Sequence, residues 1–432
     1  MNFIMVDKAM KSANDSCKSI DAKFNFEVEF LDRHIEDVLK NSEASYEQVS
    51  FMALTIMGFI LSHAGMKETS LMMLDFSNSG TGKSSNMTLQ YKWLLKAILE
   101  QQDALQVSTS DEDSTARYIN VHRGKITVPA LYQCIKTVPA QLIMIDELGL
   151  LLQKDDDIIG EVTKLYGAEE ASAPMLKTEA PSSKSIMPVA LSFVGATTLS
   201  YFGSTQKLKH HLMGGFVNRA LIAYNTKLKL PEEITSLVSQ NRDYTSSNKT
   251  AVELLHFIKN TYSELVYSEA SEHMLIEFKK EIQSIKIDLH SDGHDNYALF
   301  YNRVLQNAQT IINILHALKC FEKKRWNSMI DVVTVELGIS FIKKIVFPEI
   351  EKLIDYLSDG DLLTSEERHK VKIVNFVQEY LAEHNKMPKI RDVSQKTRLS
   401  KNAVLEMIKD FLEVVPGTTI LRYVNDHSRE VS

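Results

Sequence analysis

A phosphate-binding pattern occupies residues 77–84, which read Ser-Asn-Ser-Gly-Thr-Gly-Lys-Ser. It departs from the usual pattern only at Ser77, which replaces a glycine at the start of the loop, where a side chain costs less than at Gly82. In this pattern Lys83 reaches the β- and γ-phosphates of a nucleotide, and the Ser84 hydroxyl binds Mg²⁺. We expect the polyphosphate to be held by Ser79, Gly80, Thr81, Gly82, Lys83, Ser84 and Ser85.

Two adjacent carboxylates, Asp146 and Glu147, end an apolar run in the segment QLIMIDELG. Asp146 would hold Mg²⁺ through water, and Glu147 would orient and deprotonate the attacking water. Adjacent carboxylates after a strand are also common as plain surface residues. Paired with Lys83 and Ser84, however, they predict hydrolysis of a nucleotide.

These side chains can meet only if a parallel sheet brings them together. Residues 70–76 are short and apolar and predict a buried strand, and residues 83–100 have apolar residues at helical spacing. Residues 141–149 predict a second buried parallel strand, whose carboxyl end is where open α/β sheets bind ligands. From about 66 to 228, strand-like runs alternate with helical stretches, which predicts an α/β core.

A further predicted strand, over residues 188–198, ends in Thr197 and Thr198. In proteins that hydrolyse nucleotides at the end of a parallel sheet, the strand beside the Asp-Glu strand often ends in a polar side chain. This side chain contacts the γ-phosphate or the attacking water. Two threonines simply leaving a strand are an equally simple interpretation. Before this strand we expect a helix over residues 158–166 and a long mobile excursion over residues 169–184.

Two arginines are candidates for contact with a transferring phosphoryl group. Arg219 stands at the entrance to a predicted strand within the segment GGFVNRALIAY, which we place on the far side of the sheet order from Lys83. It is either a structural ion-pair partner or a residue that completes a neighbouring subunit's active site. Residues 248–358 are helical in pattern, and Arg303 opens the clearest amphipathic stretch, from which it could reach back to the nucleotide.

Residues 365–432 predict a small separate module. Short helices over 390–397 and 401–413 are joined by a turn in which Ser400 can cap the second helix, and residues 420–424 predict a strand that would form a wing. Such a helix-turn-helix commonly places its second helix in the major groove, although many winged helices bind only protein. Phosphate contacts would come from Lys389, Arg391, Lys396, Arg398, Lys401 and Lys409.

The composition is that of an ordinary globular chain of 432 residues, with 44% hydrophobic and 24% charged residues. A net charge of −7 argues against a protein that coats nucleic acid generally. The three cysteines are far apart and lack metal-type spacing, which predicts buried thiols in a reducing compartment. We find no signal-peptide pattern, and the apolar run at residues 51–61 is too short to span a bilayer, so we expect a cytoplasmic protein without membrane contact.

The segments FSNSGTGKSS, LIMIDELG, PVALSFVGATT and GGFVNRALIAY together resemble ring-forming P-loop ATPases (AAA+) of phages, plasmids and other mobile elements. These are relatives of superfamily 3 and minichromosome-maintenance replicative helicases. The stretches SEASEHMLIEFKKEI, YNRVLQNAQTIINILHALK and VTVELGISFIKKI are similar to the α-helical lid that follows such cores. The resemblance covers about residues 66–355 by motif and the C-terminal winged helix by pattern alone.

The resemblance implies roles for individual residues and for partners. Lys83, Ser84, Asp146 and Glu147 would bind and hydrolyse ATP with Mg²⁺. One of the two threonines would be a polar sensor, Arg219 an arginine finger and Arg303 a second sensor. It further implies a hexameric ring acting on single-stranded or forked DNA in a bacterial host cell. Residues 1–65 lack a primase-type metal cluster, so a primase or polymerase would act in trans.

The predicted fold class is therefore α/β: a P-loop NTPase core with a parallel sheet, an α-helical lid and a C-terminal winged helix. The expected boundaries are 1–65 for an N-terminal helical segment, 66–230 for the ATPase core, 231–362 for the α-helical domain and 363–432 for the winged helix.

The sequence is compatible with three functions. The leading prediction is an ATP-driven DNA helicase or translocase in the replication of a phage or mobile element. The alternative is a DNA-bound ATPase switch that loads or regulates a partner without unwinding. A non-catalytic assembly protein is the third, and Glu147 argues against it because a structural nucleotide site needs no base beside its metal ligand.

Overall fold

The computed structural model describes residues 23–100, 120–149, 156–172, 186–198, 211–226, 245–358 and much of 373–423, with single gaps at 125, 169 and 213 in the earlier ranges.

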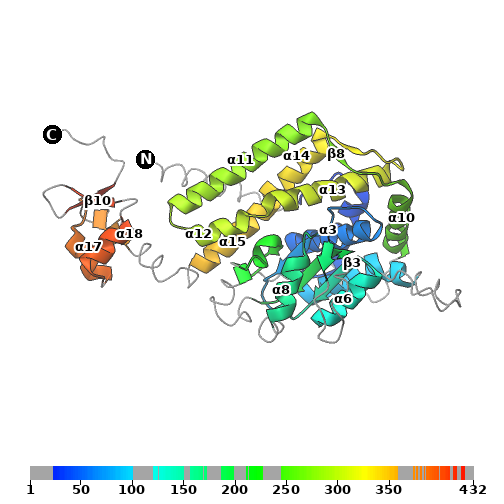
Figure 1. Ribbon diagram of the computed structural model, residues 1–432, viewed down its shortest axis with the longest axis horizontal. Coiled ribbons are helices and arrows are strands. Elements are labelled where there is room, and N and C mark those ends of the chain that lie inside the picture. Colours follow the sequence, from blue (N-terminus) through cyan, green and yellow to red (C-terminus); the bar gives the residue numbers. More distant parts are fainter. Residues whose placement is uncertain are drawn as a thin grey trace.

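The α/β part is built on one five-stranded parallel sheet (Figure 1). Its strands are β1 (Met72–Asp75), β2 (Asn120–Arg123), β3 (Ala140–Ile145), β6 (Ala190–Ala196) and β7 (Leu221–Ala223). Their order across the sheet is β2-β3-β6-β1-β7. Every residue of β1 and β3 is buried, as expected for parallel strands covered on both faces. Because β6 lies between β3 and β1, the carboxyl ends of these three strands meet at one edge of the sheet.

Helices precede the sheet and connect its strands. They are α2 (Glu29–Asn41), α3 (Tyr46–His63), α4 (Lys83–Gln90) with its π-helical continuation η1 (Tyr91–Leu95), α6 (Val128–Thr137) and α8 (Asp156–Leu165). The predicted helix over 158–166 is thus confirmed as α8. Helix α3 packs against β3 and β6, and its residues are buried on all sides from Gln48 to Leu61, so it is a core helix.

A short antiparallel ribbon stands between α8 and β6, where β4 (Glu170–Ser172) pairs with β5 (Ile186–Pro188). The sequence predicted a mobile excursion over residues 169–184. Residues 170–172 are instead a strand, because pairing with 186–188 satisfies their backbone groups. The rest of that excursion lies outside the described residues.

A mainly helical part follows β7 and gathers beside the sheet (Figure 1). It comprises α10 (Thr245–Thr261), β8 (Val266–Tyr267), α11 (Glu269–Ser291), α12 (Asp295–Ala298), the 3-10 turn η5 (Leu299–Tyr301), α13 (Val304–Glu322), β9 (Met329–Ile330), α14 (Val332–Phe341), the π-helical turn η6 (Ile342–Val346) and α15 (Phe347–Ser358). Helix α13 packs on α3, and one buried hydrophobic cluster runs from Phe26 to Leu353. The N-terminal helices, the sheet and the helical part therefore share a core, and the predicted boundaries between them stay a prediction.

The C-terminal residues build a second, smaller buried cluster that includes Val393, Val404 and Leu421. It forms from α17 (Ile390–Thr397), α18 (Lys401–Ile408) and the antiparallel strands β10 (Leu412–Val414) and β11 (Leu421–Tyr423). The predicted cap at Ser400 is confirmed, since its Oγ accepts a hydrogen bond from the backbone N–H of Ala403 at 3.2 Å.

The helix predicted over residues 401–413 is too long. Helix α18 ends at Ile408, because residues 412–414 pair with 421–423 in a hairpin whose inward side chains cover the small core. Two of the predicted phosphate contacts, Arg398 and Lys409, lie outside the described residues.

Two of the three cysteines can be placed. Cys134 is partly exposed and Cys320 is buried, and both are free thiols. Cys17 lies outside the described residues. Among the described helices, none is both long and apolar enough to cross a bilayer.

Glu349 links the helical part to the end of the sheet. It lies on α15, is almost fully buried, and accepts a hydrogen bond from the backbone N–H of Tyr224 at 2.6 Å, directly after β7. Lys352, one turn along α15, bonds its other oxygen. Burial, reinforced by the charge of Glu47, raises the pKa of Glu349 to about 7.

The raised pKa of Glu349 predicts a pH-dependent stability. A carboxyl whose pKa is higher in the folded than in the unfolded protein costs stability as pH rises from the unfolded to the folded value. Between about pH 5 and pH 8 the wild type should therefore lose stability relative to Glu349→Gln, by up to about 3 kcal/mol. Urea unfolding of both proteins at the two pH values measures the difference. A gap that stays constant with pH contradicts the prediction.

Candidate nucleotide-binding site

The loop between β1 and α4 has the backbone geometry of a phosphate cradle. Gly80 and Gly82 have φ of 83° and 79°, a left-handed region that favours glycine. Gly82 directly precedes α4, whose first residue is Lys83, so the free N–H groups and the positive end of the helix dipole face the loop. Asn78, Ser79, Gly80 and Ser84 are exposed, so a ligand can reach the loop from solvent.

The turn between α2 and α3 closes on this loop at Gly82. A β-carbon on Gly82 would lie 2.4 Å from the backbone nitrogen of Ala44 and 2.6 Å from the carbonyl carbon of Glu43. Glycine is therefore required here for two reasons, the positive φ and the close approach of a second backbone. The turn between the two N-terminal helices thus packs directly against the loop.

Lys83 is held at the loop by two carbonyls. Its Nζ donates to the backbone oxygens of Ser77 and Asn78, both at 2.6 Å. Burial lowers the pKa of Lys83, while the charges of Asp75 and Asp146 act to raise it. The charge of Asp146 therefore acts on Lys83, and the strand order places both residues at the carboxyl edge of the sheet.

Ser77, the one departure from the usual loop pattern, makes hydrogen bonds that anchor the loop. Its N–H donates to Asp75 Oδ1 at 3.0 Å, and its Oγ accepts the N–H of Asn225 at 3.0 Å. Asn78 N–H in turn bonds the carbonyl of Asn225 at 2.8 Å. These bonds continue the β1–β7 ladder into the loop, so a serine here fixes the loop's start where glycine could not.

The ends of β3 and β6 bring the other predicted side chains to the same edge. Asp146 and Glu147 follow β3 directly and are exposed. Thr197 follows β6, and its N–H donates to the carbonyl of Asp75 at 2.8 Å, which places the threonines between the loop and the carboxylates. Thr197 is buried and its hydroxyl donates to the carbonyl of Thr198, which is the more exposed of the two.

The donor set suits a magnesium nucleotide rather than a metal caged by protein. Within the described residues no group of three or more His, Cys, Asp or Glu side chains could hold a metal ion. Mg²⁺ commonly takes one or two protein oxygens and completes its shell with phosphate and water. The exposed Ser84 hydroxyl and Asp146 carboxylate supply such oxygens, while the loop and Lys83 supply the contacts that phosphates need.

The two predicted arginines lie together at the opposite edge of the sheet. Arg219 ends the 3-10 turn η3 (Val217–Arg219) just before β7, and its Nη1 donates to the carbonyl of Gly215 at 2.6 Å. Burial lowers the pKa of Arg219, and the nearby charge of Arg303 lowers it further. Both charges also act on Tyr166, whose hydroxyl donates to the carbonyl of Ser70 at the start of β1.

This position corrects two expectations. Arg219 is not on the far side of the sheet order, because β7 pairs directly with β1. The separation instead runs along the strands: Leu221 pairs with Met73, so Arg219 stands level with residue 71, roughly 20 Å from the loop at about 3.3 Å per residue. Arg303 donates to Gln306 at 2.7 Å beside Arg219, so the structure brings it to that arginine and not to the loop of its own chain.

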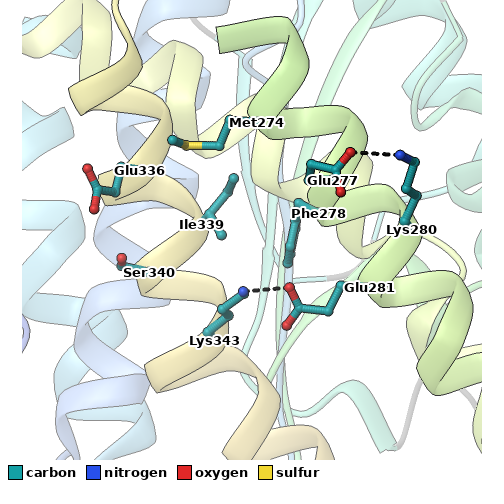
Figure 2. A pocket seen from close by; sticks show the side chains of 9 residues that line it. All are labelled: Met274, Glu277, Phe278, Lys280, Glu281, Glu336, Ile339, Ser340 and Lys343. Carbon is teal, nitrogen blue, oxygen red and sulfur yellow. Dashed lines mark hydrogen bonds and ion pairs between the residues drawn. The ribbon is translucent and has the colours of Figure 1, made fainter. Parts of the chain in front are cut away.

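A groove between α11 and α14 lies elsewhere in the helical part. Figure 2 shows Met274, Phe278 and Ile339 at its apolar floor, with an ion pair between Lys343 and Glu281 at 2.5 Å across it. None of the predicted site residues lines this groove.

Sequence reasoning missed several buried polar residues behind the loop. Gln48 donates to Asp75 at 2.8 Å, and Asn86 donates to the carbonyl of Gln48 at 3.0 Å. Two signals in the sequence point to these residues. Ser45 and Gln48 have the spacing of a capping box, and Asp75 is an acidic residue inside an apolar strand.

Comparison with known proteins adds little to this geometry. No protein-family model matches the chain, and no curated protein matches its sequence. A solved structure described as a "putative ATPase" from Cytophaga hutchinsonii is similar with a TM-score of 0.34 and 11% identity, covering 78% of this chain and 89% of its own.

The close contact at Gly82 predicts a specific loss of nucleotide binding. Gly82→Ala should weaken ATP binding tenfold or more, because the new methyl group displaces either the loop or the α2–α3 turn. Gly65→Ala is the matched control: Gly65 has φ of 100° but open space around it, so only backbone strain of about 1–2 kcal/mol is expected.

Calorimetric titration with ATP and thermal melting of both variants measure the two effects. Equal ATP affinity in Gly65→Ala and Gly82→Ala would contradict a role for the turn in shaping the loop.

Proposed function

We propose that this chain is an ATP hydrolase that uses Mg²⁺. The observation that carries the proposal is the meeting of three strand ends at one edge: the loop with Lys83 after β1, Thr197 after β6 and the carboxylates after β3. A parallel sheet offers its carboxyl edge to ligands, and these are the side chains that phosphoryl transfer to water requires.

Each residue has a distinct role in the proposed reaction. Lys83 leaves the carbonyls of Ser77 and Asn78 and binds the β- and γ-phosphates. Ser84 and Asp146 hold Mg²⁺, which neutralises charge on the phosphates. Glu147, exposed beside Asp146, orients the water and takes its proton, and a threonine hydroxyl after β6 contacts the γ-phosphate or that water.

We further propose that the protein works as a ring, with six subunits as the resemblance to replicative ATPases suggests. Arg219 and Arg303 form a pair of guanidinium groups for which no ion pair with a carboxylate is found among the described residues, and Arg219 Nε is buried without a hydrogen-bond partner there. Two such cations favour an anion from outside the chain. Because they lie far from their own loop, a neighbour's γ-phosphate is the anion that fits this arrangement.

The proposed work is DNA unwinding or translocation during replication of a phage or mobile element, inside a bacterial host cell. We interpret the C-terminal helices and hairpin as a winged helix whose Lys389, Arg391, Lys396 and Lys401 could contact phosphates. A primase or polymerase would act in trans.

The alternative is a DNA-bound ATPase switch that loads or regulates a partner. ATP hydrolysis measured with and without single-stranded DNA tests for DNA as the partner. Sustained strand displacement by the purified protein separates the helicase from the switch. If the wild type neither binds nor hydrolyses ATP, both proposals fail.

Substitutions of Lys83 and of Glu147 should have different effects on ATP binding and on turnover. Lys83→Ala removes a cation from the phosphates and should weaken both ATP binding and turnover. Glu147→Gln keeps the size and hydrogen-bonding capacity of the side chain, so it should bind ATP yet lose turnover by roughly a hundredfold or more, the scale of general-base loss. Calorimetric binding and phosphate release measure the two steps. A normal rate of ATP hydrolysis by Glu147→Gln would contradict the proposed mechanism.

Arg219 should act between subunits. Arg219→Ala is expected to keep ATP binding and lose most turnover, and mixing it with Glu147→Gln should restore part of the activity. Restoration is expected because mixed rings contain interfaces where an intact Glu147 faces an intact Arg219. Co-assembly is checked by light scattering in the presence of ATP and DNA. Mixed but fully inactive rings, or a protein that stays monomeric under these conditions, would count against the arrangement.

A further inference from the structure

A buried carboxylate stands immediately before the phosphate-binding loop. Asp75, the last residue of β1, is fully buried. Its Oδ1 accepts the N–H of Ser77 at 3.0 Å, and its Oδ2 accepts the side-chain amide of Gln48 at 2.8 Å. A carboxylate out of water is costly unless its oxygens are hydrogen-bonded, so these partners are needed for Asp75 to remain where it is.

Gln48 forms hydrogen bonds through both ends of its side-chain amide and through its backbone carbonyl. These bonds join the start of α3, the end of β1, helix α4 and the segment after β7. Its Oε1 accepts the N–H of Ser45 at 2.7 Å, as the capping box of α3, and the side-chain amide of Asn225 at 3.3 Å. Its Nε2 donates to Asp75, and its carbonyl accepts the side chain of Asn86 on the loop's own helix, α4, at 3.0 Å. Gln48 is itself fully buried, and its bonds to Asp75 and Asn86 are buried as well, so water does not compete with these two.

The position of Lys83 depends on this pair. Asp75 holds the N–H of Ser77, and the carbonyl of the same residue holds Lys83 Nζ. A shift of Asp75 therefore moves the peptide groups at the start of the loop and, with them, the lysine that must reach the phosphates.

We propose that Gln48 and Asp75 are positioning residues for nucleotide binding, acting through their mutual hydrogen bond on the start of the loop. The inference rests on the proposed ATP hydrolysis. This proposal gives the N-terminal helices a function. Gln48 lies on α3, so its hydrogen bond to Asp75 links the position of α3 to the start of the phosphate-binding loop. Neither residue is proposed to touch the nucleotide.

The hydrogen-bond chemistry of the pair allows a sharp test. In Asp75→Asn an amide nitrogen can face the amide nitrogen of Gln48, donor against donor. In Gln48→Glu two carboxylates face each other. In the double variant the new amide at position 75 donates to the new carboxylate at position 48, whose other oxygen still accepts from Ser45 and Asn225. The bonding pattern is then restored with the acid and the amide exchanged.

The experiment compares the wild type, the two single variants and the double variant in ATP affinity, KM, kcat and melting temperature. Each single variant should bind ATP tenfold or more weakly and change KM more than kcat, and the double variant should recover to within about threefold of the wild type. Leu318→Ala, which opens a cavity in α13 away from the loop, is the control: it should lower the melting temperature and leave ATP affinity unchanged.

Wild-type affinity in either single variant overturns the proposal. So does a double variant that melts like the wild type but binds ATP as poorly as the single variants, because the charge of Asp75 and not the hydrogen bond would then matter. If the single variants fail to fold, the double variant decides alone, by folding and binding ATP within about threefold of the wild type or not. A wild type that does not bind ATP contradicts the proposed function itself, and this is established before any variant is compared.

Discussion

The arrangement of the site depends on how the end of β1 is held. Asp75 is buried where the strand becomes the phosphate-binding loop, and burial raises the pKa of its carboxyl, opposed by the bonds from Ser77 and Gln48 and by the charge of Lys83. Because a buried carboxyl tolerates few alternative partners, the backbone on either side has little freedom. The loop's start, the end of β6 and the segment after β7 are all bonded to this short stretch.

The same constraint explains how distant segments reach one site. Gln48 comes from an N-terminal helix that is buried on all sides, and Glu349 comes from α15, yet Gln48 bonds Asn225 while Glu349 bonds the neighbouring Tyr224. The two residues after β7, Tyr224 and Asn225, are therefore hydrogen-bonded to both the helical part and the N-terminal part. A change in either part can therefore reach the loop through one or two hydrogen bonds.

The two ends of the sheet strands have different charged groups beside them. The carboxyl edge has Asp146 and Glu147 beside a lysine, which suits a metal-bound polyphosphate. The other edge has two arginines, and Gly215 leaves space for one of them, since a β-carbon there would lie 2.1 Å from Arg219 Nη1. The proposed ring rests on this separation, because an arginine at one end of the strands could meet a phosphate bound at the other end only in a second copy of the chain.

The sequence by itself determined four of the five sheet strands (β1, β3, β6 and β7), the loop and the candidate residues, because those signals are local: an apolar run, glycines at a tight turn, a lysine opening a helix. It did not predict β2. It also indicated that Lys83, Asp146 and the threonines share an edge, since parallel strands put their carboxyl ends together. Only the tertiary structure decided where Arg303 lies, that Ser77 is a bonded part of the loop, and that Gln48 supports Asp75. Those facts depend on contacts between residues far apart in the chain, and hydrophobic periodicity carries no information about which buried polar groups become partners.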